Sequence, residues 1–252
     1  MKFIFIEMDF YLAHHSVDDH LINIFLRLHQ QGHKIYLCTR RNKGSLKNLP
    51  LPVDGVIASA GSYIEDHNQV LLKMYLSKED VYRLESALNS LGVMYQLETT
   101  DMLFMDIRLL KQRCNKVLEG SDVSIETGRR LKAFKEQEGI TEISKYDGEP
   151  VHKIGFKSDA ISKIVSIEKV YGDEFDFVFL REDGEKITGE IRRKHVDVKE
   201  GIKTILQYNH GSVEQSVAFC ELSDALKLKD FLPKTIVIGD DLELVLKQEN
   251  LI

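Results

Sequence analysis

A short apolar run that ends in two acids constrains this chain more than any other segment. Residues 3 to 6 read Phe-Ile-Phe-Ile, and Glu7 and Asp9 follow with one residue between them. A run of this kind is typical of a strand buried on both faces of a parallel sheet. Side chains alternate along a strand, so we expect both acids to point the same way at its carboxyl end, where open α/β sheets bind ligands. Two like charges aimed together indicate either a cation between them, with Mg²⁺ the obvious candidate, or a solvated turn.

Helices and strands alternate after this first strand. Apolar residues at helical spacing predict a helix over residues 17 to 31, and short apolar runs predict strands over 34 to 39 and 53 to 59. This is the pattern of a parallel sheet with crossover helices. The same pattern returns near the end of the chain, with helices expected over 199 to 208, 223 to 229 and 242 to 248 and strands over 216 to 219 and 235 to 238.

The middle of the chain has a different pattern. A hairpin is expected over residues 62 to 71, and residues 108 to 145 are charge-rich and mostly helical in character. A second hairpin is expected across Asp183-Gly184, which is a favoured turn pair. We therefore predict an α/β fold in two domains, of which residues 1–77 and 193–252 form one, and residues 78–192 form an inserted α+β domain.

Charge and cysteine usage restrict the partners and the compartment. The net charge of −6 over 252 residues argues against broad nucleic-acid binding, which needs a basic face. No apolar run approaches the roughly 18 residues that would span a bilayer, and the N-terminus lacks the pattern of a signal peptide. The three cysteines are far apart, which is typical of free thiols in a reducing compartment. We expect a cytoplasmic protein with no nucleic-acid or membrane partner.

The layout and its motifs together resemble the haloacid dehalogenase (HAD) superfamily, and most of all its Cof-type sugar-phosphate phosphatases. Residues 7 to 12, Glu-Met-Asp-Phe-Tyr-Leu, stand where the family has Asp-x-Asp-Gly-Thr-Leu. The resemblance implies a HAD-like Rossmannoid parallel-sheet core with an inserted α+β cap domain of the C2 type. It also implies that Glu7 takes the place of the nucleophile and Asp9 that of the general acid/base. Glu7 is one methylene too long, and Phe10 and Tyr11 replace Gly and Thr, so we expect weakened catalysis.

Two further motifs resemble the family's phosphate-binding positions. Residues 38 to 41 read Cys-Thr-Arg-Arg. In this segment, Thr39 matches the family's phosphate-binding hydroxyl and Arg41 matches the arginine of the subfamily. Lys199, at the start of a predicted helix where backbone donors favour an anion, matches the phosphate-binding lysine. The alternatives are a solvated arginine loop and an ordinary surface lysine. The turn before the expected hairpin resembles the family's Asn-Gly-Ala turn, with Ala60 in place of Asn.

The fourth motif supplies Mg²⁺ ligands in the family, as Gly-Asp-x-x-Asn-Asp after a strand. Here residues 219 to 224, Phe-Cys-Glu-Leu-Ser-Asp, follow an apolar run. Asp224 then fits the last acid of the motif, and Cys220 replaces the first acid. A thiolate suits softer metals than Mg²⁺. A rival placement uses Asp240 and Asp241, which would leave the usual next strand and helix missing. The resemblance implies a weakened Mg²⁺ site; its predicted ligands are Glu7, Asp9 and Asp224.

Two functions remain open at this point. The first is a Mg²⁺-dependent phosphatase of small phosphorylated metabolites, with reduced or lost activity because motif residues are substituted. The second is a catalytically inactive HAD-fold module that binds a ligand or a protein partner. A third interpretation, an α/β protein unrelated to this superfamily, has only the sheet pattern in its favour.

Overall fold

The computed structural model describes residues 1–9, 17–120, 124–183, 186–238 and 242–252, and these form two compact units. The first unit comprises residues 1–41, 48–73 and 196–252, and the second comprises residues 42–47 and 74–195. These limits lie a few residues from the predicted domain boundaries. Residues 42–47, which we expected in the first domain, group with the second unit instead.

A seven-stranded sheet forms the centre of the first unit, in the order β13-β12-β1-β2-β3-β4-β5. Pairing is parallel from β13 to β3 and antiparallel from β3 to β5. Each of the five residues of β1 is buried, because β1 lies between β12 and β2 and helices cover both faces of the sheet. The strands are β1 (Phe3–Glu7), β2 (Lys34–Cys38), β3 (Gly55–Ala58), β4 (Tyr63–Asp66), β5 (Gln69–Lys73), β12 (Ser216–Cys220) and β13 (Thr235–Val237).

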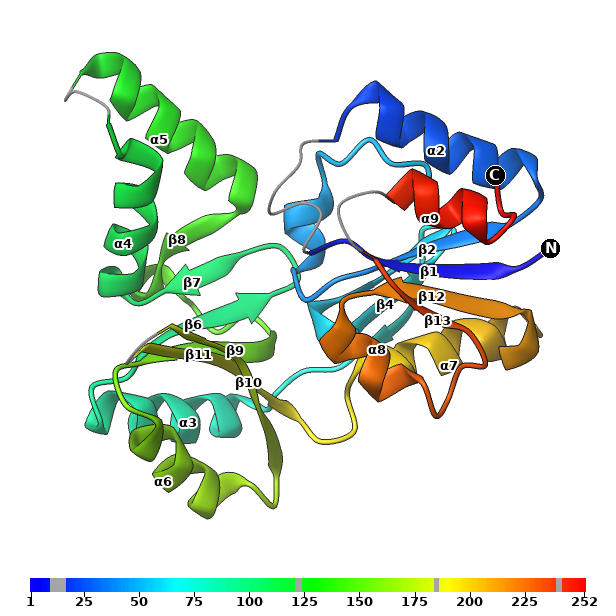
Figure 1. Cartoon of the computed structure of the whole chain (residues 1–252). Coiled ribbons are helices and arrows are strands. Elements are labelled where there is room, and N and C mark those ends of the chain that lie inside the picture. The colour runs from blue at the N-terminus through cyan, green and yellow to red at the C-terminus, as the bar shows by residue number, and fades with distance from the viewer. Residues whose placement is uncertain (10–16, 121–123, 184–185, 239–241) are drawn as a thin grey trace. The chain divides into compact units, whose positions relative to one another are not determined.

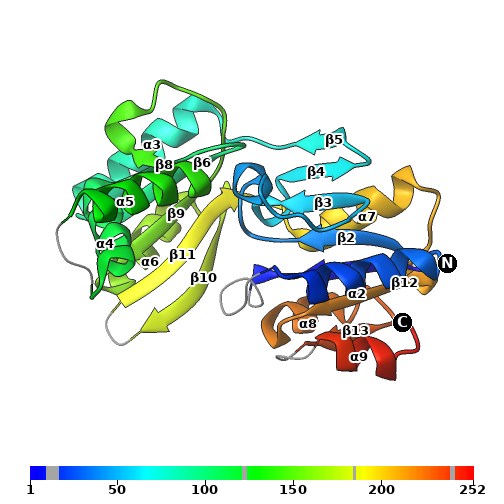
Figure 2. The same ribbon diagram turned by 90° about the horizontal axis from the view of Figure 1, so that it is seen from above.

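Helices cover both faces of this sheet (Figure 1). One face carries α2 (Asp19–Gln30) and α9 (Leu242–Gln248), and the other carries α7 (Val198–Tyr208) and α8 (Leu222–Leu228). The view in Figure 2 shows α2 in front of the central strands and α7 behind them. Each of these helices follows a strand, as the alternating sequence pattern predicted. The predicted α/β architecture is confirmed.

Local sequence signals explain where these helices begin. The carboxylate of Asp18 accepts the N–H of Leu21 at 2.9 Å and caps α2. Asp197 caps α7 in the same way, through the N–H of Glu200 at 2.8 Å. The apolar side of α7, which carries Ile202 and Ile205, then packs in one core cluster with Phe5, Tyr36 and Ile57 of the sheet.

A six-stranded sheet, in the order β10-β11-β9-β6-β7-β8, forms the centre of the second unit. Only β7 and β8 pair in parallel among its described strands. The strands are β6 (Met94–Thr99), β7 (Leu103–Met105), β8 (Ile140–Glu142), β9 (Val151–Ser158), β10 (Phe175–Asp183) and β11 (Lys186–Arg193). Helices α3 (Lys78–Ser90) and α6 (Ile161–Tyr171) bury one face, while α4 (Ile107–Leu118) and α5 (Ile125–Glu138) pack against β7 and β8. No helix in the described part of the chain is both long and apolar enough to cross a membrane.

Candidate functional site

The polar residues singled out from the sequence collect at the carboxyl ends of the parallel strands. Glu7 ends β1, Thr39 follows β2, and Asp224 lies in the first turn of α8, directly after β12. Parallel register places Cys38 opposite Glu7 and Phe219 opposite Ile6. β1 has β2 on one side and β12, not β13, on the other. The segment from Cys220 to Asp224, which follows β12, therefore lies beside Glu7.

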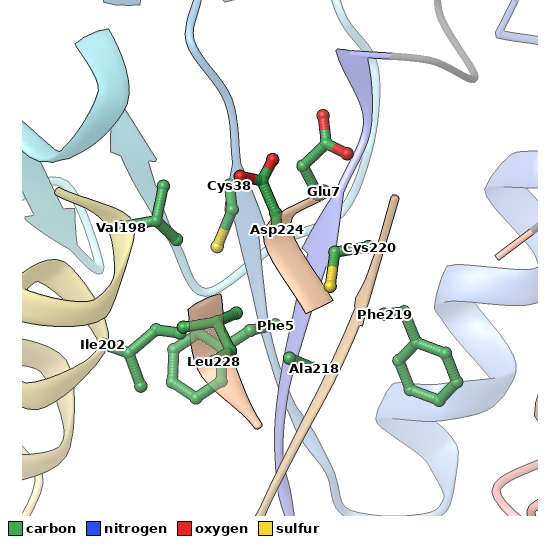
Figure 3. A pocket seen from close by; sticks show the side chains of 10 residues that line it. All are labelled: Phe5, Glu7, Cys38, Val198, Ile202, Ala218, Phe219, Cys220, Asp224 and Leu228. Carbon is green, nitrogen blue, oxygen red and sulfur yellow. The ribbon is translucent and has the colours of Figure 1, made fainter. Parts of the chain in front are cut away.

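Glu7 lines a small cavity beneath this edge of the sheet (Figure 3). The carboxylates of Glu7 and Asp224 lie at one end of it, and the thiols of Cys38 and Cys220 point toward its apolar end. Its volume is about 20 Å³, which is room for about one water molecule. The remaining lining residues are Phe5, Val198, Ile202, Ala218, Phe219 and Leu228.

The Glu7 carboxylate is held by the backbone on both of its oxygens. Oε1 accepts the N–H of Asp9 at 3.0 Å, and Oε2 accepts the N–H of Glu221 at 3.3 Å. Only 6% of the residue is exposed. Burial raises the pKa of Glu7 to about 7, and the negative charges of Asp9 and Glu221 add to the effect. Near neutral pH, Glu7 is therefore protonated more often than an exposed glutamate would be.

The Asp9 carboxylate lies among donors that follow β2. Its Oδ1 accepts the hydroxyl hydrogen of Thr39, and its Oδ2 accepts the N–H of Arg40 at 2.7 Å. The Nε atoms of Arg40 and Arg41 lie 3.5 Å and 3.7 Å from the two carboxylate oxygens. The expectation that Glu7 and Asp9 point the same way assumed that both lie on one strand. β1 ends at Glu7, so strand alternation does not reach Asp9, and the two carboxylates bind different neighbours.

A strained turn holds the segment that follows β2. Ser59 donates its N–H to the carbonyl of Arg41 at 2.8 Å, and Ala60 donates to the carbonyl of Thr39 at 3.1 Å. Both donors have positive φ, at 49° and 55°, which costs free energy in residues other than glycine. Gly61, at φ 101°, is required because a Cβ there would lie 2.2 Å from the carbonyl oxygen of Asp197.

The two remaining predicted residues lie at helix starts. Lys199 is half-buried in the first turn of α7, directly after Val198, which lines the cavity. Its ammonium makes no ion pair with any residue that the structure describes. Asp224 accepts a hydrogen bond from the ammonium of Lys227 at 2.7 Å. Its carboxylate therefore already has a cationic partner one helical turn away.

The predicted Mg²⁺ ligands do not form a ligand set. Over residues 1–9, 17–120, 124–183, 186–238 and 242–252, no three His, Cys, Asp or Glu side chains are grouped so as to hold a metal ion. Asp9 binds Thr39 and Arg40 instead. The thiols do not supply a substitute, because burial raises the pKa of Cys220 to about 12 and that of Cys38 well above its usual range. Both thiols therefore stay protonated at neutral pH.

Some predicted positions lie outside the described residues, and sequence reasoning missed others. Phe10, Tyr11, Asp240 and Asp241 are not described, so the rival placement of the fourth motif stays a prediction. The backbone donors of Arg40 and Glu221 were missed. No residue type signals such donors, because a backbone N–H acquires its role only from the fold.

Known proteins resemble the chain over nearly its whole length. The family model described as haloacid dehalogenase-like hydrolase matches residues 4–220. A haloacid dehalogenase-like hydrolase from B. subtilis is 18% identical, with a TM-score of 0.72 over 97% of this chain and 92% of that chain. A HAD-superfamily phosphatase from Bacteroides thetaiotaomicron is 16% identical, with a TM-score of 0.70 over 100% of this chain and 96% of that chain. A HAD subclass IIB sugar phosphatase is 14% identical, with a TM-score of 0.72 over 100% of both chains. No curated protein matches the chain.

Proposed function

The chain belongs to the haloacid dehalogenase-like hydrolases, and from that premise we propose that it binds a small phosphorylated metabolite and hydrolyses the phosphate ester slowly. Its structural neighbours include phosphatases, one of them a sugar phosphatase. The gathering of the Thr39 hydroxyl, the N–H of Arg40 and the guanidinium of Arg41 at the carboxyl end of the first unit's sheet supports phosphate binding there. The three free, buried cysteines support placing this function in the cytoplasm.

The tethered carboxylate of Glu7 is the observation that carries the proposal of slow turnover. A nucleophile must present an oxygen in line with the phosphorus atom, and a misplacement of about 1 Å can cost roughly 10²-fold in rate. Both oxygens of Glu7 accept backbone N–H groups. Its pKa of about 7 further reduces the ionised fraction that could attack at neutral pH. These two features support the proposal that Glu7 is a poor nucleophile.

The other residues have clearer roles in binding. The Thr39 hydroxyl and the Arg41 guanidinium would donate hydrogen bonds to phosphate oxygens, and Lys199 would add a positive charge at the start of α7. Asp9 would protonate the leaving group, as its family position implies. HAD-superfamily enzymes typically use Mg²⁺. Since the described acids of this chain are not arranged as its ligands, we assign no step to the ion.

Binding and turnover of phosphate monoesters test this proposal. We expect slow hydrolysis of small sugar phosphates by the whole chain, and at least a tenfold loss of kcat/KM in Lys199→Ala. The matched control is Lys203→Ala on the same helix, where the ammonium pairs with Glu200 at 2.6 Å; this variant should retain the wild-type rate. If the wild-type chain neither binds nor hydrolyses any phosphate monoester, the proposal fails.

A catalytically inactive binding module is the second candidate. The contacts of Asp9 favour it, because the acid/base residue binds the phosphate donors and is not directed at a substrate. Such a module would bind a phosphorylated ligand or a protein partner without turnover. Ligand binding together with hydrolysis that stays undetectable in every variant, including Glu7→Asp, would favour this candidate over the slow phosphatase.

A further inference from the structure

We propose that the Asp9 carboxylate is an internal occupant of the phosphate site, so that a phosphate group binds only by displacing it. This inference rests on the proposed function, because it describes how the same site is regulated. It assigns Asp9 an inhibitory contact in the free protein, in addition to any role in the reaction.

The donors around Asp9 are those of an oxyanion site. They comprise the hydroxyl of Thr39, the peptide N–H of Arg40 and the guanidinium groups of Arg40 and Arg41. Hydroxyl, peptide and guanidinium donors in one place are the usual means of binding phosphate oxygens. The Asp9 side chain is only 10% exposed, so it fills this site and does not lie across its surface.

The site is held by contacts that do not involve Asp9. The N–H of Arg41 donates to the hydroxyl oxygen of Thr39 at 3.0 Å. The carbonyls of Thr39 and Arg41 accept hydrogen bonds from Ala60 and Ser59, on the strained turn. Since these carbonyls are fixed by the turn, the peptide donors of the segment keep their direction when Asp9 leaves. Another anion can then take its place without a rearrangement of the backbone.

Charge favours phosphate over the internal carboxylate. The guanidinium groups of Arg40 and Arg41 each have an atom within 4 Å of the Asp9 carboxylate, which supplies a charge of −1. A phosphate monoester carries about −1.5 to −2 near neutral pH and has three acceptor oxygens. It therefore matches the site better than a carboxylate with two oxygens. Only molecules in which Asp9 has left the site can bind the ligand. The apparent affinity is therefore the intrinsic affinity multiplied by the fraction of molecules in which the site is open.

Calorimetric titration with inorganic phosphate tests the inference. We expect Asp9→Asn and Asp9→Ala to bind phosphate at least tenfold more tightly than the wild-type chain. The matched control is Glu221→Gln, which removes a negative charge near Glu7 but not from the Thr39 site; its affinity should change less than threefold. Adding Thr39→Val to Asp9→Asn should abolish the gain. Circular dichroism of each variant confirms that the fold is retained.

The outcomes separate this inference from the proposed function. If the wild-type chain binds phosphate as tightly as both Asp9 variants, Asp9 is not an occupant and only the inference is overturned. The same holds if Glu221→Gln gains as much as Asp9→Asn, because the effect is then a general one of charge. If none of the variants binds phosphate or a phosphate monoester, both the inference and the proposed function are overturned.

Discussion

Thr39 donates its hydroxyl hydrogen to the carboxylate of Asp9, across the ends of two adjacent parallel strands. The two residues are 30 positions apart in the sequence, and each was singled out there for a different role. Their contact joins the segment after β1 to the segment after β2. It also gives a partner to the hydroxyl of Thr39, a residue whose exposed fraction is only 1%.

We predict that Thr39→Val lowers the free energy of unfolding by about 1–3 kcal/mol. The change removes the donor to Asp9 and the acceptor for the N–H of Arg41, so two partly buried polar groups lose a partner. Thr39→Ser keeps both hydrogen bonds and should lose less than half as much. Urea unfolding of the two variants measures this difference, and equal losses would show that the hydroxyl does not stabilise the fold.

The raised pKa of Glu7 predicts a specific dependence of stability on pH. The folded chain binds the Glu7 proton more tightly than the unfolded chain, because the pKa rises from 4.5 to about 7 on folding. The contribution of Glu7 is therefore complete below about pH 4.5 and is lost as the pH rises through about 7. Its size is on the order of 3 kcal/mol.

Glu7→Gln isolates this contribution, since glutamine keeps the shape of the side chain but does not titrate. Between pH 4.5 and pH 8, the unfolding free energy of the wild-type chain should fall relative to that of Glu7→Gln. Chemical denaturation across this range gives the difference directly. A difference that is constant with pH would mean that Glu7 titrates normally.

The strained turn predicts a stabilising substitution at Ala60. Glycine adopts a φ of 55° without the steric penalty that alanine has there, although it also adds entropy to the unfolded chain. We expect Ala60→Gly to raise the unfolding free energy by about 0.5–1 kcal/mol, and Ala60→Val to lower it by about 1–2 kcal/mol. Thermal unfolding measures both. Ala58→Gly, at φ −107° in β3, is the control and should be destabilising.

A buried lysine in the second unit predicts a large loss on substitution. The ammonium of Lys153 pairs with Glu190 and lies 3.7 Å from Glu98, and all three side chains are at least 90% buried. Lys153→Met leaves both carboxylates without this cation, which should cost about 3–5 kcal/mol.

The matched control is Lys157→Met on the same strand, where the ammonium donates to Gln112 at 2.8 Å near the surface. It should cost less than about 1 kcal/mol, as for other exposed contacts. Adding Glu190→Gln to Lys153→Met should restore part of the loss. Similar losses for the two lysine variants would contradict a special role for the buried cluster.

Much of the fold was predictable because apolar periodicity reflects burial. The run before Glu7 indicated a central parallel strand, and helical spacing over residues 17 to 31 indicated the helix that forms as α2. The short strand β8 was missed within a charge-rich, helical segment, because its three residues carry too little pattern. The grouping of residues 42–47 with the second unit was missed as well, since it depends on long-range contacts such as the N–H of Gly44 with the carbonyl of Thr100 at 2.8 Å.

The candidate site was predictable in its members but not in its contacts. Motif positions identified Glu7, Asp9 and Thr39, which the structure places at one edge of the sheet. The sequence could not show that β1 ends at Glu7, and this end directs Asp9 toward Thr39. Nor could it show that the N–H of Glu221 binds Glu7, because this contact requires β12 to be the neighbour of β1.

Hydrolysis of p-nitrophenyl phosphate with Mg²⁺, by the wild-type chain and by Glu7→Asp, tests whether Glu7 limits the rate as a poor nucleophile. A shorter side chain restores the family's nucleophile and withdraws from at least one of the two backbone donors. We expect slow wild-type hydrolysis and an increase in kcat/KM of about ten- to a hundredfold in Glu7→Asp. A wild-type rate that equals or exceeds that of Glu7→Asp would contradict this expectation, because Glu7 would then already be an effective nucleophile.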